Sequence, residues 1–393
     1  MNNTSQQWIR AIVAPAVAAL ALALSMALAQ AQIYQTSAKH AILMDGDTGT
    51  VLYSKEGTEK FPPASLAKLM TMAVVFEQLK RGKLSLTDTF YVSERAWREG
   101  GANSGGSTMF AKLNSEIPLE DLIRGIIIQS ANDGCIVIAE GLAGSEAAFA
   151  GLMNERARDI GLADSHFTNA TGLPDPLQNV TAADLAKLSQ YIIREYPEYF
   201  KYYSEESFSW NGINQPNRNP LLKMGIGADG MKTGYTDESG YAIVGTVKRE
   251  NRRLITVLSG MTTMKERAEE ARKILDWGSR AFEKLKLFDD GEVIGEASVY
   301  GGEKSGVAVT GKGPVEIYAP IGFRDKLQAR IVYTGPLIPP VEQGKQVATL
   351  KVWIGDDLSQ ETPLYAAETV EQGGLRRRSI DAVKELLLGM VPL

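Results

Sequence analysis

The sequence has very few metal ligands and no pair of cysteines. Cys135 is the single cysteine, and His40 and His166 are the only histidines. One cysteine cannot form an internal disulfide, and so small a set argues against a zinc site or a cysteine-rich scaffold. Cys135 lies in an apolar helical stretch, so we interpret it as a small buried hydrophobic residue.

The chain also lacks a basic excess and a hydrolase elbow. Its net charge is -5, whereas a nucleic-acid-binding surface needs surplus lysine and arginine. No Gly-x-Ser-x-Gly motif occurs, which argues against an α/β-hydrolase active site. The composition, 44% hydrophobic and 23% charged over 393 residues, is that of a soluble protein with room for two domains.

Residues 1–31 have the pattern of a secretory signal peptide. Arg10 supplies positive charge, an apolar run covers residues 11–28, and Ala29-Gln-Ala31 is a small-x-small cleavage site. The run approaches spanning length, so an uncleaved membrane anchor stays open as the alternative. No cysteine lies near the cleavage site for lipid attachment. Export removes a protein from ATP, which favours hydrolysis or transfer as its chemistry.

Residues 32–282 predict an α+β domain, an antiparallel sheet with helices on both sides. Two hairpins frame it, around the turn at 46–49 and around the polar stretch 248–253. A Gly-rich turn is expected over 225–234. Apolar residues at helical spacing predict the helices. These are expected at 65 to about 80, 119–128, 135–142, 146–160 and 264 to about 286.

Two smaller regions follow this domain. Residues 283–372 alternate short β-rich runs with glycine and proline, which predicts a small all-β domain of sandwich type. In residues 373–393, three arginines ending at Arg378 precede a helical pattern with one apolar face. We interpret this tail as an amphipathic helix that lies on an anionic membrane surface. A terminal helix docked on the β domain stays open as the alternative.

A serine and a lysine stand three residues apart in Pro63-Ala-Ser65-Leu-Ala-Lys68, the only Ser-x-x-Lys in the chain. On a helix this spacing places both side chains on one face, so that the amine can reach the hydroxyl. A neutral lysine there could take the hydroxyl proton and activate the serine without histidine. Alone the pattern is weak, because similar pairs are common on solvated helices.

Two further motifs give the first one its weight. Ser130-Ala-Asn132 lies between two predicted helices, and Lys232-Thr-Gly234 stands before a predicted strand. In this order the three patterns are typical of penicillin-recognising acyl-transferases. Residues 209–211 and 304–306 also match the second and third patterns. The former lie too close to Lys232 for a separate helical lobe, and the latter lie in the β-rich region.

From about His40 to the C-terminus the chain resembles the D-alanyl-D-alanine carboxypeptidases, which are low-molecular-mass penicillin-binding proteins of the serine DD-peptidase family. The resemblance implies a DD-peptidase/β-lactamase-like catalytic domain and a substrate that is a peptidoglycan stem peptide ending in D-Ala-D-Ala. It further implies acylation by β-lactam antibiotics, no metal or cofactor, and a periplasmic location on the outer face of the inner membrane. The matching segments are Pro63-Ala-Ser65-Leu-Ala-Lys68-Leu-Met-Thr71, Ser130-Ala-Asn-Asp133, His166-Phe-Thr-Asn and Asp229-Gly-Met-Lys232-Thr-Gly-Tyr-Thr236.

The resemblance assigns acyl transfer to four residues. Ser65 attacks the penultimate peptide carbonyl, and Lys68 is its base. Lys68 then needs a pKa below its usual value of about 10.4, and we expect burial and the charge of Lys232 to lower it. Ser130 passes a proton to the leaving D-alanine, and Asn132 orients Lys68 and the substrate amide.

The third motif is expected to hold the substrate. Lys232 and Thr233 bind its terminal carboxylate, which a carboxypeptidase recognises and an internal endopeptidase does not. Gly234 lets the substrate backbone lie against the strand. The backbone N–H groups of Ser65 and Tyr235 form the oxyanion hole.

One position departs from the best-known branch of the family, in which an arginine follows the second hairpin strand and helps to hold the carboxylate. That position is Met261 in this chain. Lys265 or Arg267 is available to replace the arginine, or Lys232 and Thr233 suffice.

Three alternatives to a carboxypeptidase share part of this pattern. A class A β-lactamase needs a loop glutamate to activate the deacylating water, but no glutamate occurs between Glu155 and Glu195. His166 lies in that loop, and we interpret it as a packing residue. Hydrolysis of β-lactams is therefore expected to be slow. A DD-endopeptidase that cuts peptidoglycan cross-links is the closer alternative. A non-catalytic wall-binding protein is disfavoured by the intact serine and lysines.

Overall fold

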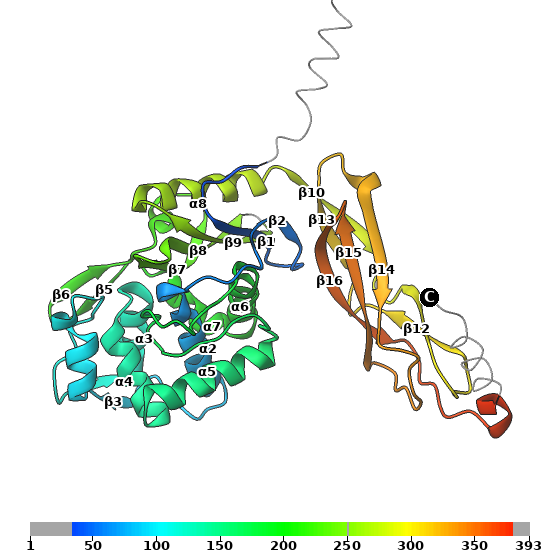
Figure 1. Ribbon diagram of the computed structural model, residues 1–393, viewed down its shortest axis with the longest axis horizontal. Helices are drawn as coiled ribbons and strands as arrows, with labels where there is room; N and C mark the ends of the chain where they lie inside the picture. The colour runs from blue at the N-terminus through cyan, green and yellow to red at the C-terminus, as the bar shows by residue number, and fades with distance from the viewer. Residues whose placement is uncertain (1–33, 250, 380–393) are drawn as a thin grey trace, which may run out of the picture. The chain divides into compact units, whose positions relative to one another are not determined.

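The computed structural model describes residues 34–249 and 251–379 (Figure 1). The predicted signal peptide, residues 1–31, lies outside the described residues. Of the predicted tail helix, one helical turn at residues 375–379 is described. The apolar face that suggested membrane association lies beyond it.

A five-stranded antiparallel sheet forms the centre of the first domain. Its strands are β1 (His40–Asp45), β2 (Val51–Lys55), β7 (Ala228–Thr236), β8 (Gly240–Arg249) and β9 (Arg252–Met261). Their order is β2-β1-β9-β8-β7, which makes β7 an edge strand. Both predicted hairpins are confirmed, since β1 pairs with β2 and β8 pairs with β9. The middle residues of β8 and β9 are buried without alternation, as expected for a sheet covered on both faces.

Helices cover both faces of this sheet, so the predicted α+β architecture is confirmed (Figure 1). They are the 3-10 helix η1 (Ala64–Ala67), α2 (Lys68–Lys80), α3 (Leu119–Ile128), α4 (Asn132–Ala143), α5 (Glu146–Ile160), α6 (Ala182–Glu195), α7 (Pro197–Phe200) and α8 (Met264–Gly278). α8 packs on β8 and β9 from one side, and α6 packs on β1 and β9 from the other (Figure 1). α2 lies inside the helical layer, and its residues from Lys68 to Glu77 are all buried.

Short elements complete this domain. They are β3 (Thr89–Tyr91), the π-helical turn η2 (Ala96–Gly100), the 3-10 turn η3 (Ala102–Ser104), β4 (Glu116–Pro118), the 3-10 turn η4 (Lys201–Ser204), β5 (Ser207–Trp210), β6 (Ile213–Pro216) and the 3-10 turn η5 (Pro220–Lys223). Among the described residues no single helix is long and apolar enough to cross a membrane. α4 and α5 meet that test only together, as a pair bent by 84°.

Two sequence predictions about element limits were wrong. The helix expected to run to about residue 286 ends at Gly278, and residues 282–288 form a strand instead. That strand buries Phe282 and Leu285 against a partner strand, a contact that helical spacing within the segment does not reveal. The Gly-rich turn expected over 225–234 is mostly β7, because its backbone pairs with β8 from Ala228 onward.

The second domain is all-β, as predicted. Its strands are β10 (Phe282–Phe288), β11 (Val293–Ser298), β12 (Gly306–Thr310), β13 (Val315–Pro320), β14 (Leu327–Val332), β15 (Gln346–Ile354) and β16 (Asp357–Ala366), with the 3-10 turn η6 (Arg324–Lys326) between β13 and β14. β10 and β13 form one two-stranded sheet, and the others form a sheet in the order β11-β12-β16-β15-β14. Alternate residues of these strands form a separate hydrophobic core.

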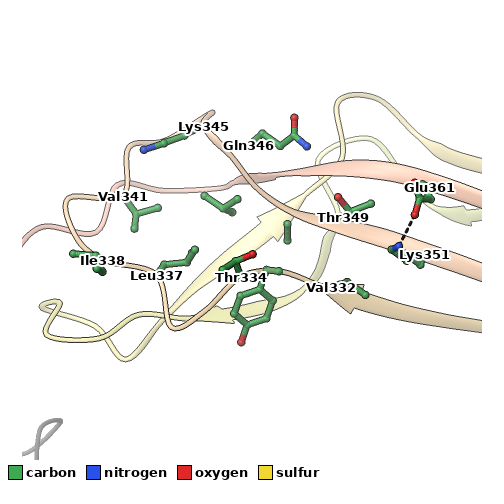
Figure 2. Close-up of a pocket in the computed structure, with 13 residues that line it drawn as sticks. Val332, Thr334, Leu337, Ile338, Val341, Lys345, Gln346, Thr349, Lys351 and Glu361 are labelled. Atoms are coloured by element: carbon green, nitrogen blue, oxygen red, sulfur yellow. Dashed lines mark ion pairs between the residues drawn. The ribbon is translucent and has the colours of Figure 1, made fainter. Parts of the chain in front are cut away.

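A cleft of about 770 Å³ lies beside the start of β15 (Figure 2). β14 ends opposite Thr349, so the first residues of β15 border the loop after β14 rather than a strand. Leu337 and Val341 supply apolar surface, and Lys351 forms an ion pair of 2.6 Å with Glu361. Among the described residues, no serine or cysteine lines this cleft.

Candidate active site

Ser65 lies in a strained turn, not within a single helix as predicted. η1 carries Ser65, and α2 begins at Lys68. Ala64, directly before the serine, has φ of +47°, which is unfavourable for a residue with a side chain. The carbonyl oxygen of Ala64 lies against Gly172, where a Cβ atom would come within 1.9 Å of it. The turn at Ser65 is therefore held by close backbone packing from a distant loop.

The side-chain nitrogen of Lys68 is buried and surrounded by three oxygen atoms. Its Nζ atom lies 2.9 Å from Ser65 Oγ, 2.8 Å from Asn132 Oδ1 and 2.5 Å from the carbonyl oxygen of Thr171. The amide and carbonyl oxygens can only accept hydrogen bonds. A neutral amine has two hydrogens, which these two acceptors use, and its lone pair then faces the Ser65 hydroxyl. The geometry suits a base for Ser65.

The pKa of Lys68 is lowered to about 8, chiefly by burial and in smaller part by the charge of Arg218, while Cys135 and Asp133 oppose the change. The sequence interpretation expected Lys232 to contribute to this shift. The repulsion between these two buried lysines lowers the pKa of Lys232, for which burial is the larger cause. A substrate carboxylate at this site would favour the protonated form of Lys232.

Ser130 and Asn132 stand where α4 begins. Ser130 has φ of +65°, and among the described residues its buried hydroxyl has no hydrogen-bond partner. Next to Asn132, the fully buried Asp133 accepts hydrogen bonds from the backbone N–H groups of Met109 and Ala111. This carboxylate fixes the start of α4 and so the position of Ser130 before it. The Ser130 hydroxyl is available to a substrate because it has no partner among the described residues.

The third motif lies within β7, at the edge of the sheet. The buried Lys232 donates a hydrogen bond of 3.0 Å to the carbonyl oxygen of Thr233. A Cβ atom at Gly234 would lie 3.3 Å from Cβ of Ala64 and 3.4 Å from Leu66. In this structure the missing side chain of Gly234 therefore admits the turn that carries Ser65, a contact that the sequence interpretation did not foresee.

A cavity of about 600 Å³ joins these elements. Lys68, Asn132 and Lys232 are buried and do not line it, so they act from beneath its surface. The two other motif matches, residues 209–211 and 304–306, which we call decoy motifs, do not line this cavity. Ser209 belongs to β5, and Lys304 precedes β12. The lining residues are Ser65, Gly105, Gly106, Ser107, Ser130, Arg218, Thr233, Gly234, Tyr235, Tyr241, Met264 and Arg267.

Arg218 and Arg267 add positive charge to this cavity. The Arg267 side chain is buried, its guanidinium lies 5.7 Å from the Tyr241 ring centre, and its Nε atom has no partner among the described residues. Lys265, the other replacement considered for Met261, is 85% exposed in its side chain. Sequence reasoning missed Arg218 and the Thr171 carbonyl, because no local pattern marks either one.

The loop before α6 supplies no carboxylate to the cavity. Asp164 lies 3.9 Å from Lys60, and Asp184, within the first turn of α6, accepts a hydrogen bond from Ser165. His166 is exposed and lines a separate hollow beside α5. These positions agree with the sequence argument that a β-lactamase glutamate is missing.

Family and structural relatives match nearly the whole described chain. The family model for D-alanyl-D-alanine carboxypeptidases matches residues 26–263, and that for the C-terminal domain of penicillin-binding protein 5 matches residues 282–372. D-alanyl-D-alanine carboxypeptidase DacC of Escherichia coli is 38% identical over 349 residues, covering 88% of this chain and 87% of the relative. The chain belongs to the D-alanyl-D-alanine carboxypeptidase family. It is a serine-type hydrolase and a penicillin-binding protein.

Solved structures agree with this family assignment. Penicillin-binding protein 5 from Haemophilus influenzae is 35% identical, with a TM-score of 0.72 over 86% of this chain and 99% of that one. Penicillin-binding protein D2 from Listeria monocytogenes, solved in its ampicillin-bound form, is 28% identical, with a TM-score of 0.55 over 63% of this chain and 99% of that one. The two-domain fold of this carboxypeptidase is therefore that of its family.

Proposed function

We propose that this carboxypeptidase removes the terminal D-alanine of peptidoglycan pentapeptide stems through an acyl-enzyme on Ser65. Lys68 takes the hydroxyl proton as Ser65 attacks the penultimate carbonyl. Ser130 lines the cavity, and its hydroxyl has no hydrogen-bond partner among the described residues. It gives its proton to the departing amine and takes up the proton that Lys68 holds, so both groups return to their starting states. The observation that carries the proposal is the contact of the buried Lys68 amine with Ser65, Asn132 and Thr171. Water then hydrolyses the acyl-enzyme.

Carboxylate recognition separates a carboxypeptidase from an endopeptidase. Thr233, Arg218 and Arg267 line the cavity, and Lys232 adds positive charge from below. A carboxylate bound here would be desolvated and paired with guanidinium groups, which is a strong arrangement. In the best-known branch of the family an arginine at the position of Met261 helps to hold the substrate carboxylate, but Met261 is uncharged and buried in β9. We propose that Arg267 makes this contact instead.

We expect an acylated D-Ala-D-Ala peptide to be cleaved about a hundredfold faster than the same peptide with a C-terminal amide. The physical reason is that the amide leaves the buried cations without a counter-charge, a cost of about 3 kcal/mol. Release of free D-alanine or D-alanine amide measures both rates. Equal rates would favour the endopeptidase. Arg267→Gln should narrow the ratio, whereas Arg272→Gln, at a half-exposed position on the same helix, should leave it unchanged.

Penicillins should acylate the same serine, and the resulting penicilloyl ester should be hydrolysed slowly. In the part of the chain that the structure describes, no glutamate or aspartate lines the cavity to activate a deacylating water. Acylation by the peptide releases free D-alanine, which departs and lets water reach the ester. Acylation by penicillin opens a ring, so the leaving amine stays attached to the acyl group and blocks the approach of water. We therefore propose a long-lived penicilloyl enzyme.

The proposed domain limits are a signal peptide at 1–31, a catalytic domain at 32–282, an all-β domain at 283–372 and a membrane-associating helix at 373–393. The sequence patterns of the first and last segments support export to the periplasm and attachment to the outer face of the inner membrane. Arg376, Arg377 and Arg378 would face anionic lipid headgroups.

Deleting residues 374–393 is expected to move the protein from the membrane fraction to the soluble periplasmic fraction. The deleted segment holds the only apolar helical face next to an arginine cluster in the sequence. Immunoblotting of fractionated cells measures the change, and penicillin labelling of the soluble product shows that the catalytic domain is folded. A full-length protein found only in the soluble fraction would support the docked-helix alternative.

A further inference from the structure

Two apolar side chains of the all-β domain are almost entirely exposed. Ile338 is 80% exposed and Leu375 is 79% exposed, the highest values for large apolar residues in the part of the chain that the structure describes. Ile338 belongs to the loop 335–340 and lies at one end of the cleft beside β15 (Figure 2). Leu375 begins the helical turn 375–379, which leads into the predicted tail helix.

A shared backbone segment holds the loop and the start of the tail together. Leu337 makes hydrogen bonds of 2.8 and 2.9 Å to the backbone of residues 298–300. One residue further on, the carbonyl oxygen of Gly301 accepts a hydrogen bond of 2.9 Å from the N–H of Gly373, just before the tail. The loop 335–340 and the start of the tail therefore lie at the same end of the all-β domain.

The loop has few backbone donors that a lipid environment would leave unpaired. Pro336, Pro339 and Pro340 have no N–H group, and the N–H of Leu337 is already bonded within the protein. An unpaired N–H group costs free energy in the apolar part of a bilayer, so this composition lowers the cost of entering it. Ile338 supplies an apolar side chain that gains free energy from leaving water.

The charges at this end of the domain are mixed. Arg376 and Arg378 are exposed and form no ion pair within 4.0 Å among the described residues. Such arginines can contact anionic lipid headgroups. Glu303 and Glu371 are also exposed on the neighbouring segments and offset part of that attraction. The apolar side chains are therefore the main source of membrane affinity expected from the loop.

We propose that the loop 335–340 is a second membrane contact, at which Ile338 enters the lipid interface beside the tail. Leu375 belongs to the tail, and Leu386 follows it at a spacing of about three helical turns, so both fall on the apolar face of the predicted helix. Two contacts at one end of the all-β domain fix its orientation on the membrane, which a single contact would not. The inference rests on the proposed tail attachment, because one inserted side chain binds weakly unless the tail holds it at the surface.

Flotation of the purified full-length protein with vesicles of phosphatidylethanolamine and phosphatidylglycerol tests this contact. Ile338→Ser should weaken vesicle binding about tenfold, the usual scale for burial of one isoleucine side chain. The matched control is Ile321→Ser, which removes another isoleucine, 61% exposed, where the chain enters the all-β domain beside Ala281. That variant should bind like the wild-type protein. Thermal unfolding shows whether either variant is destabilised.

A fluorophore on the loop measures insertion without relying on affinity. Cys135 is buried, so a nitrobenzoxadiazole group can be attached selectively at the introduced thiol of Ile338→Cys or Ile321→Cys. Adding vesicles should raise and blue-shift the emission of labelled Ile338→Cys, because the group moves from water into the lipid interface. The emission of labelled Ile321→Cys should not change.

The outcomes separate the loop from the tail. Equal vesicle binding by Ile338→Ser and Ile321→Ser, or no emission change for labelled Ile338→Cys, would overturn the loop contact, while flotation of the wild-type protein would still support the tail. No flotation of the wild-type protein would overturn both. An emission rise without vesicles that grows with protein concentration would assign the loop to contact between two copies of the chain and would also overturn the proposal.

Discussion

The Ser65→Ala variant is expected to lose both covalent labelling by a fluorescent penicillin and release of D-alanine from a pentapeptide. Under the proposed function the serine oxygen forms the acyl bond in both reactions, and the Ser65 hydroxyl lies 2.9 Å from the Lys68 amine. Removing the nucleophile of a serine protease lowers kcat by on the order of 10⁶-fold. Gel fluorescence and a D-alanine assay measure the two losses.

The decoy motif provides the matched control. Ser209 belongs to a Ser-x-Asn pattern like that of Ser130, but it lies on β5 and its hydroxyl donates to Asn214 at 3.3 Å. Ser209→Ala should label and cleave like the wild-type protein. Labelling that survives in Ser65→Ala would sink the acyl-enzyme assignment. Unchanged thermal unfolding of Ser65→Ala would show that the loss is chemical.

Replacing Lys68 by methionine is expected to slow acylation by about 10²–10⁴-fold, the usual contribution of a general base. Methionine is similar in length and apolar, so it fills the buried site without a base. Lys265→Met, at a position with an 85% exposed side chain, is the matched control and should be unchanged. Stopped-flow measurement of penicillin acylation gives the rates without interference from deacylation.

The pH profile of acylation distinguishes loss of the general base in Lys68→Met from a change in the structure of the site. Burial lowers the pKa of Lys68 from 10.5 to about 8, so roughly a tenth of the enzyme has a neutral lysine at pH 7. The neutral form is the active one, so wild-type acylation should rise with pH up to about 8 and fall about tenfold per unit below it. Lys68→Met should show no such rise. A wild-type rate independent of pH between 6 and 8 would contradict Lys68 as the base.

The pH dependence of Lys232 acts in the opposite sense. Burial and the charge of Lys68 lower its pKa, so it loses its proton at lower pH than a free lysine would. A neutral Lys232 attracts the substrate carboxylate less, which should reduce kcat/KM on the alkaline side. Because the two lysines interact, the limbs of such a profile belong to the pair rather than to either residue.

Sequence patterns predicted those features of the site that depend on short-range spacing. Alternation predicted the two hairpins, and helical periodicity predicted the helices at 119–128 and 146–160. Fixed offsets between residues identified the three motifs and their order. Local spacing was less reliable at element ends. Residues 282–286 continue a helical pattern, yet they pair with β13. Strand pairing depends on a partner segment far along the chain, which local spacing does not show.

By itself the sequence predicted that Ser65, Lys68, Ser130, Asn132 and Lys232 belong to one kind of active site, because motif order is a property of the chain. Only the tertiary structure decided how these residues are arranged. It brings Lys68 to Asn132, 64 residues away, and to the Thr171 carbonyl, 103 residues away. It also buries that lysine and turns Arg267 toward the cavity. The pKa of Lys68 depends on burial and on distant charges, which the spacing of neighbouring residues does not encode.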